Sequence, residues 1–408
     1  MNPTRNYTAL GKRALVALVA FALTGGAALY AQEEMGPKLQ RLTDPPKVDQ
    51  KKAELGKLLF FDKRMAQDSN RSCAECHNPT QGFTTRLAIS DGYPATKHYR
   101  NAPTVLNSAY LHRYFWHGSL GDLPTLVRWH NVAAFFQNAD GRYREENTRQ
   151  IPEYVKRFKE IYGQRFHLYG DILEVISEYV KTVVSDPQHV PFDRYLATGK
   201  GLTSSQIRGM ELFNGKARCV QCHNGPLGTD QKFYNTAVPH NPVLDSDVEH
   251  KIAMRYEYLI IGLNQYVKNP TRDWGLYILT KDKADMGKFR TAPLRELKYT
   301  APYMHNGILE TLEQVVDFYN NGGGHDPLLL PTKDPRIKPL GLSPSEKKDL
   351  VAFLEALSSD PQPFNKWPDN VGEEKILFGV YPYFSKPWQY KPGEQNVKEL
   401  PEPVRLTR

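Results

Sequence analysis

The chain has 408 residues, with 53 lysines and arginines against 45 aspartates and glutamates, which gives a formal net charge of +8. Apolar residues make up 40 % of the chain and aromatic residues 11 %, so a disordered protein is excluded. The modest basic excess argues against nucleic acid as a partner, a single apolar stretch excludes a multi-span membrane protein, and four cysteines are too few for a disulfide-stapled scaffold.

Residues 1–31 have the layout of a secretory signal peptide. Three basic residues come before an apolar run over 14–23, and small residues then lead to Ala31. The alternative is an uncleaved membrane anchor, because the apolar segment 14–31 is near the lower length limit for spanning a bilayer. Both interpretations take the chain out of the cytoplasm, so we expect a periplasmic protein.

Helical patterns dominate the rest of the chain, and the clearest strand pattern is at 256–262. We expect helices at 49–60, 152–162, 171–184, 204–213, 312–319 and 343–357. A polar linker at 198–201 comes before Thr203, a good N-cap residue for the fourth of these helices. The sequence therefore predicts two domains, residues 32–199 and 200–360, followed by a proline-rich extended tail, residues 361–408.

All four cysteines lie in two copies of one motif, Cys73-Ala-Glu-Cys76-His77 and Cys219-Val-Gln-Cys222-His223. This pattern is the signature of covalent haem c attachment, in which two thiols on one turn bind the porphyrin and the histidine binds the iron. A zinc site or a redox-active cysteine pair would also use such cysteines, but both copies carry the histidine and no cysteine is left over. The sequence therefore predicts a mainly α fold with two cytochrome-c-like haem domains in tandem, two haem c groups and few strands.

Around these motifs the sequence resembles the bacterial di-haem cytochrome c peroxidases, including their MauG branch. The matching segments follow in family order at 55–62, 72–77, 100–107, 115–116, 202–223, 289–295 and 301–307. The resemblance implies that the first haem reacts with hydrogen peroxide and that the second relays electrons. It also implies an electron donor, either a small cytochrome c or a cupredoxin, or the side chains of a protein substrate as in MauG.

The resemblance makes a prediction about access to the first iron. Family members that need reductive activation have a histidine capping this iron, ten residues before the proline of the Asn-Ala-Pro-Thr segment. Counting back from Pro103 reaches Tyr93, and we expect His98 in the same loop to be an exposed surface residue. The iron held by His77 is therefore expected to be open to peroxide without prior reduction.

The second haem is expected to differ from that of the conventional peroxidases, which have a methionine ligand fourteen residues after the histidine of the Pro-Tyr-x-His segment. From His305 this count reaches Tyr319, where the MauG branch has a tyrosine ligand. A phenolate donates charge and favours the higher oxidation states of iron, whereas a thioether favours ferrous iron. Tyr319 is therefore the expected ligand, and Met304 is the alternative.

Two more catalytic roles follow from the resemblance. Trp116 matches a tryptophan between the two haems and is expected to relay electrons, with simple packing as its alternative role. The glutamate that carries protons in the family has no counterpart here. We nominate Asp140 to move a proton between the peroxide oxygens as their bond breaks; the alternatives are Glu145, Glu146, His130 and His117.

The family also binds a calcium ion between its domains, through an asparagine side chain and two backbone carbonyls. Asn101, Thr300 and Pro302 match these positions and offer the oxygen donors that calcium prefers. The sequence thus predicts a periplasmic, MauG-like di-haem peroxidase that reduces hydrogen peroxide to water. The alternative is a non-catalytic di-haem electron carrier or redox sensor, in which His98 or Met304 would cap an iron. The resemblance leaves open whether the chain forms a homodimer.

Overall fold

The computed structural model describes residues 38–364, apart from 94, 95, 164, 269, 271 and 363. The predicted signal segment lies outside the described residues, as does all of the predicted tail except residues 361, 362 and 364. Over the described residues the predicted fold class is confirmed, because fourteen α-helices accompany only two short strands. No helix in this part of the chain combines the length and the hydropathy needed to cross a membrane.

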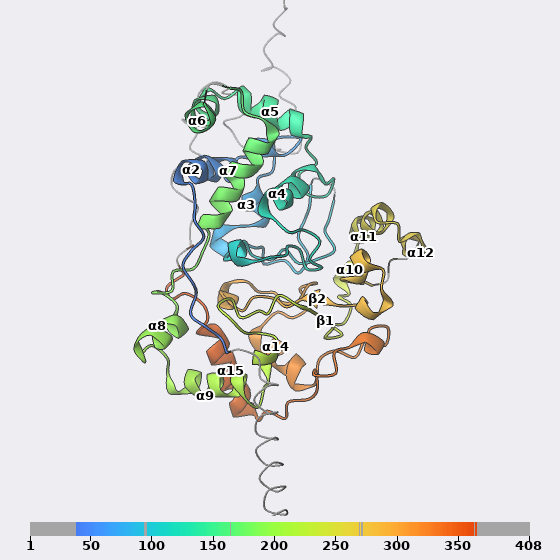
Figure 1. Cartoon of the computed structure of the whole chain (residues 1–408). Helices are drawn as coiled ribbons and strands as arrows, with labels where there is room; N and C mark the ends of the chain where they lie inside the picture. Colours follow the sequence, from blue (N-terminus) through green and yellow to red (C-terminus); the bar gives the residue numbers. More distant parts are fainter. Residues whose placement is uncertain are drawn as a thin grey trace, which may run out of the picture.

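The N-terminal half is built around two long helices, α2 (Gln50–Phe61) and α7 (Tyr169–Thr182), which lie side by side in Figure 1. A glycine permits their close contact, since a Cβ atom at Gly56 would lie only 1.7 Å from the carbonyl oxygen of Val175. The other helices of this half are α3 (Cys73–Cys76), α4 (Leu123–Val132), α5 (Gly141–Arg149) and α6 (Pro152–Tyr162).

The C-terminal half has the same kind of close helix contact, between α9 (Ser204–Asn214) and α15 (Pro344–Glu355). A Cβ atom at Gly209 would lie 2.0 Å from the carbonyl oxygen of Asp349, so glycine again permits the contact. Helix α14 (Leu312–Asn320) packs against α15 (Figure 1). The remaining helices are α8 (Pro191–Thr198), α10 (Val243–Ser246), α11 (Val248–Ile260), α12 (Asn264–Val267) and α13 (Tyr277–Thr280).

The two strands, β1 (Phe233–Tyr234) and β2 (Phe289–Arg290), form one antiparallel pair in which Phe233 is opposite Arg290. Short 3-10 helices complete the described elements: η1 (Lys63–Met65), η2 (Pro79–Gln81), η3 (Ser108–Tyr110), η4 (Cys219–Gln221), η5 (Lys283–Asp285), η6 (Leu297–Tyr299) and η7 (Leu330–Thr332).

All six predicted helices are confirmed, but the predicted strand at 256–262 is wrong. Most of these residues form the last turns of α11. Aromatic and branched residues made the segment look like a strand. The buried residues of α11 instead recur at helical spacing, because they form its inner face: Ala253, Met254, Glu257 and Tyr258.

A third buried cluster contains side chains from both halves of the chain. Tyr99 and Phe135 of the N-terminal half join Tyr258, Trp274 and Tyr277 of the C-terminal half. This cluster holds α11 and α13 beside the segment that follows the first haem-attachment motif. The division into domains near residue 200 stays a prediction.

Candidate active site

Each predicted haem-attachment motif lines a cavity of its own. The cavity beside Cys73, Cys76 and His77 has a volume of about 400 Å³, and the cavity beside the second motif has a volume of about 260 Å³. The surface of both cavities is mainly apolar. The four cysteines form no disulfide, so all four thiols are available for thioether bonds. The two sites therefore have the shape, the lining and the thiols that haem c requires.

Both motif histidines are oriented in the way a metal ligand needs. The Nδ1 of His77 donates a 3.2 Å hydrogen bond to the carbonyl oxygen of Phe83, and the Nδ1 of His223 donates a 2.9 Å bond to that of Gly228. A proton fixed on Nδ1 leaves Nε2 as the free ligand atom. Burial lowers the pKa of His77 to about 4 and also lowers that of His223, so both rings are neutral at physiological pH.

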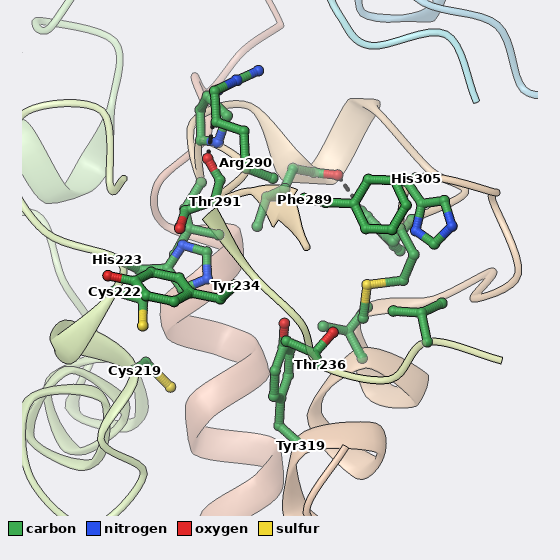
Figure 2. A pocket seen from close by; sticks show the side chains of 18 of the residues that line it. Cys219, Cys222, His223, Tyr234, Thr236, Phe289, Arg290, Thr291, His305 and Tyr319 are labelled. Carbon is green, nitrogen blue, oxygen red and sulfur yellow. Dashed lines mark hydrogen bonds between the residues drawn. The ribbon is translucent and has the colours of Figure 1, made fainter. Parts of the chain in front are cut away.

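The second cavity contains both candidate ligands for its far side. Figure 2 shows Tyr319 rising from α14 with its hydroxyl toward the cavity, opposite His223 and close to Thr236. Met304 also lines this cavity. Burial raises the pKa of Tyr319, so its phenol stays protonated unless a cation binds the oxygen. The choice between Tyr319 and Met304 stays a prediction.

Trp116 lies in the wall that the two cavities share. Its indole Nε1 donates a 2.8 Å hydrogen bond to the carbonyl oxygen of Asn101, and its own carbonyl oxygen accepts one of 2.9 Å from the backbone of Arg290. The first bond fixes the indole on a segment of the N-terminal half, and the second joins the backbone of Trp116 to β2 of the C-terminal half. This is the position that an electron relay would need, and the relay role stays a prediction.

The expectation that His98 is exposed is wrong. Its side chain lines the first cavity and is only 8 % exposed. The loop folds inward because the imidazole packs on two phenylalanines, with ring centroids 4.5 Å from Phe136 and 5.7 Å from Phe135. Tyr93, in the same loop, is not part of the cavity wall.

The nomination of Asp140 as proton carrier is not supported by where the residue lies. Its side chain is 59 % exposed, lies outside the cavity wall and caps α5 by accepting a 2.8 Å hydrogen bond from the backbone of Arg142. Glu145 and Glu146 also lie outside the wall and pair with Arg149. Helix capping and surface ion pairs account for these carboxylates.

A different carboxylate, Glu257 of α11, lines the first cavity and was missed from the sequence. It is 8 % exposed, and its Oε1 lies 3.8 Å from the Nε2 of His117. Arg100 donates to the Nδ1 of His117 and pairs with Asp273 at 2.7 Å. Burial raises the pKa of Glu257. The one sequence signal for its burial is that Glu257 falls at helical spacing from Ala253 and Met254, on the inner face of α11.

The three residues predicted to bind calcium all line the second cavity. The Nδ2 of Asn101 donates to the carbonyl oxygens of Leu87 and Ala88, and no described group donates to its Oδ1. The described residues contain no cluster of three histidine, cysteine or acidic side chains that could hold a metal. A site made of this amide oxygen and the carbonyls of Thr300 and Pro302 would suit a cation that prefers oxygen.

Two haem c attachment motifs, each with its own cavity in a mainly helical fold, define a di-haem c-type cytochrome. A family model described as di-haem cytochrome c peroxidase matches residues 50–201. The chain is 46 % identical over 355 residues to the cytochrome-c peroxidase IdrP2 of Denitromonas iodatirespirans, covering 85 % of this chain and 92 % of the relative. The chain therefore belongs to the di-haem cytochrome c peroxidase family, and it is an oxidoreductase.

Other relatives and a solved structure support this assignment. Identity is 43 % to the cytochrome-c peroxidase IdrP1 of Pseudomonas sp. strain SCT, over 89 % of this chain and 96 % of the relative. The identity to the methylamine utilization protein MauG of Methylorubrum extorquens is 31 %, over 80 % of this chain and 81 % of the relative. A crystal structure of a MauG-like protein associated with microbial copper homeostasis superposes with a TM-score of 0.69 at 28 % identity, covering 81 % of this chain and 98 % of that one.

Proposed function

We propose that this chain reduces hydrogen peroxide to water in the cavity beside His77, with electrons that enter through the cavity beside His223. The observation that carries the proposal is that Trp116 lies in the wall common to both cavities. Each turnover consumes one peroxide, two electrons and two protons and releases two water molecules. The haem groups, when bound, supply the redox chemistry for cleaving the O–O bond.

Side chains that line the first cavity, or contact its wall, would bind the iron, transfer protons and position the proton-transfer group. His77 would hold the iron of the first haem, and its hydrogen bond to the carbonyl oxygen of Phe83 fixes the ring orientation. We assign proton transfer to Glu257, which takes the proton from one peroxide oxygen and returns it to the departing oxygen. Arg100 donates to the Nδ1 of His117, so the proton of this imidazole lies on Nε2, which faces Glu257. His117 therefore positions the carboxylate.

The second cavity would set how the oxidising equivalents are stored. We propose Tyr319 as the ligand opposite His223, which would make this haem MauG-like, because a phenolate oxygen stabilises the higher oxidation states of iron. The electron donor would be a small cytochrome c or cupredoxin in the periplasm, or the side chains of a protein substrate. The resemblance of residues 1–31 to a signal peptide supports export.

A calcium ion would stabilise the junction between the halves. We propose Asn101, Thr300 and Pro302 as its ligands, since all three residues line one cavity and the Oδ1 of Asn101 accepts no hydrogen bond from the described residues. The same asparagine accepts the hydrogen bond of Trp116 at its backbone oxygen. The ion would therefore act on the electron path as well as on stability.

The proposed function is tested with the full chain carrying both haems. Reduced small cytochrome c and a reduced cupredoxin are mixed separately with the protein and hydrogen peroxide, and donor oxidation is followed by absorbance. We expect peroxide-dependent oxidation of at least one donor, at two electrons per peroxide. Peroxide that stays unconsumed with both haems attached would contradict the proposal and favour the electron carrier.

A further inference from the structure

We infer that His130 is the distal ligand of the iron that His77 holds, so that the first haem is closed by a histidine of α4 in the resting protein. The inference rests on the proposed attachment of haem at the first motif. It departs from the expectation of an open iron, and it assigns the closure to a residue outside the loop that contains Tyr93 and His98.

The distance between the two imidazoles is the first argument. The ring centroids of His77 and His130 are 6.1 Å apart, and the ring planes are inclined by 61°. Metal–imidazole bonds are about 2.0 Å long, so two imidazoles on opposite sides of one metal ion have centroids about 6 Å apart. Both rings contain the bond axis in such a pair, and rotation about this axis leaves the angle between their planes free. The observed separation therefore has room for one iron between the rings.

The hydrogen bonds of the two rings point to the same arrangement. The Nδ1 of His130 donates a 2.9 Å bond to the carbonyl oxygen of Leu126, just as the Nδ1 of His77 donates to Phe83. Neither Nε2 atom has a hydrogen-bond partner among the described residues, and both rings line the same cavity. Each histidine therefore has its Nδ1 proton held by the backbone and its Nε2 lone pair free, as metal-bound histidines do.

An internal repeat gives an independent argument. A short antiparallel bridge comes before α4, between Tyr114 and Leu120, and a matching bridge between Tyr303 and Leu309 comes before α14. The same sequence interval separates each bridge from the helix that follows it. His130 is the eighth residue of α4, and its counterpart as the eighth residue of α14 is Tyr319.

The repeat therefore gives the first haem a ligand at the position where the second haem is expected to have one. Tyr319 is the proposed ligand opposite His223, and His130 is its structural counterpart opposite His77. His98 is less suited to the same role, because among the described residues its imidazole makes ring contacts with Phe135 and Phe136 and none with His77. Peroxide would then reach the iron only after His130 has left it.

Spectroscopy of the fully oxidised protein with both haems attached tests this inference. Low-temperature electron paramagnetic resonance and near-infrared magnetic circular dichroism report spin state and axial ligands without any turnover. We expect a low-spin haem with two imidazole ligands in the wild type. In His130→Ala one haem per chain should become high-spin, and added imidazole should restore the low-spin signal. The matched control His98→Ala should keep the wild-type spectrum.

Several outcomes would overturn the inference. A high-spin haem in the resting wild type would do so without any variant, and so would loss of the two-imidazole signal in His98→Ala but not in His130→Ala. Haem content, measured as two pyridine haemochromes per chain, identifies a variant that has failed to fold. If the two-imidazole signal is present but no donor is oxidised by peroxide, the ligand assignment stands and the proposed function fails.

Discussion

The indole Nε1 of Trp116 donates a 2.8 Å hydrogen bond to the backbone oxygen of Asn101, and the backbone nitrogen of Asn101 donates one of 2.8 Å to the carbonyl oxygen of His305. A continuous chain of hydrogen bonds thus runs from the wall shared by the two cavities into the C-terminal half. Since Trp116 is also bonded to Arg290 through its backbone, its position depends on both halves of the molecule.

Replacing Trp116 by phenylalanine should slow electron transfer between the haems. The change keeps an aromatic ring in the shared wall but removes the hydrogen bond to Asn101 and an easily oxidised indole. We expect the second haem to respond to peroxide at least tenfold more slowly in stopped-flow absorbance, with two haems still attached. Trp129→Phe is the matched control, because Trp129 lines only the first cavity. An unchanged rate would leave Trp116 with a packing role alone.

Removing calcium should slow the same step. Chelation would free the Oδ1 of Asn101, whose backbone oxygen holds the indole of Trp116. We expect treatment with EGTA to lower the interhaem rate and the unfolding temperature, and added calcium to restore both, with haem content unchanged. In Asn101→Ala the interhaem rate should be low from the start and insensitive to EGTA. A wild type that contains no calcium by elemental analysis would remove this site from the mechanism.

The contact between α2 and α7 should tolerate no side chain at Gly56. A methyl group there would lie 1.7 Å from the backbone oxygen of Val175, and a backbone atom cannot move aside without separating the helices. We expect Gly56→Ala to lower the free energy of unfolding by about 1–3 kcal/mol, the usual cost of overpacking. Gly121→Ala, where no atom lies within 4 Å, is the control. Equal unfolding temperatures for the two variants would contradict the prediction.

The parts of the site that sequence could predict are those fixed by local spacing. The cysteines and histidines of the two motifs are neighbours in the chain, and their spacing alone implies the attachment chemistry. The six helices were predictable for the same reason, since each has its own apolar period. The match of Tyr319 to the MauG position also required only a count along one segment, and its role as ligand stays a prediction.

The parts that were missed depend on contacts between distant segments. Glu257 meets His117 across 140 positions of the chain, so neither residue carries a local sign of the other. His98 is buried only because Phe135 and Phe136 fold over it. Asp140 had the right chemistry for a proton carrier, but it lies outside the wall of the first cavity, which is built from segments that are far apart in the chain. Tertiary packing determines whether such residues are buried and which groups they contact, and the spacing of residues in a single sequence does not reveal that packing.

Glu257 should determine the pH dependence of peroxide reduction. The carboxylate must be ionised to accept a proton from peroxide, and burial raises its pKa above the ordinary value for glutamate. The groups around it are His117, Arg100, Asp273 and Lys281. Activity should therefore fall on the acid side, as pH drops through the raised pKa.

Substituting this residue separates the catalytic role from a structural one. We expect Glu257→Gln to lower the peroxidase rate by about 10²–10⁴-fold, the usual contribution of a general acid–base group, and to abolish the fall in activity on the acid side of the pH profile. Glu257→Asp should keep this fall in activity, at a lower overall rate. Asp140→Asn, at an exposed acid outside the cavity, should leave both rate and pH profile unchanged. A large effect of Asp140→Asn would return the proton role to that residue.

The ligand opposite His223 should set the reduction potential of the second haem. Replacing Tyr319 by methionine exchanges an anionic oxygen for a neutral thioether, which favours ferrous iron. We expect the potential of this haem to rise by on the order of 0.1 V, within the range of about 0.8 V that axial ligands span. Spectroelectrochemical titration measures the potentials of both haems. Tyr234→Phe is the control, because Tyr234 lines the same cavity but donates its hydroxyl to Asp230. If only Met304→Leu shifts the potential, the ligand is Met304 and the second haem resembles that of the conventional peroxidases.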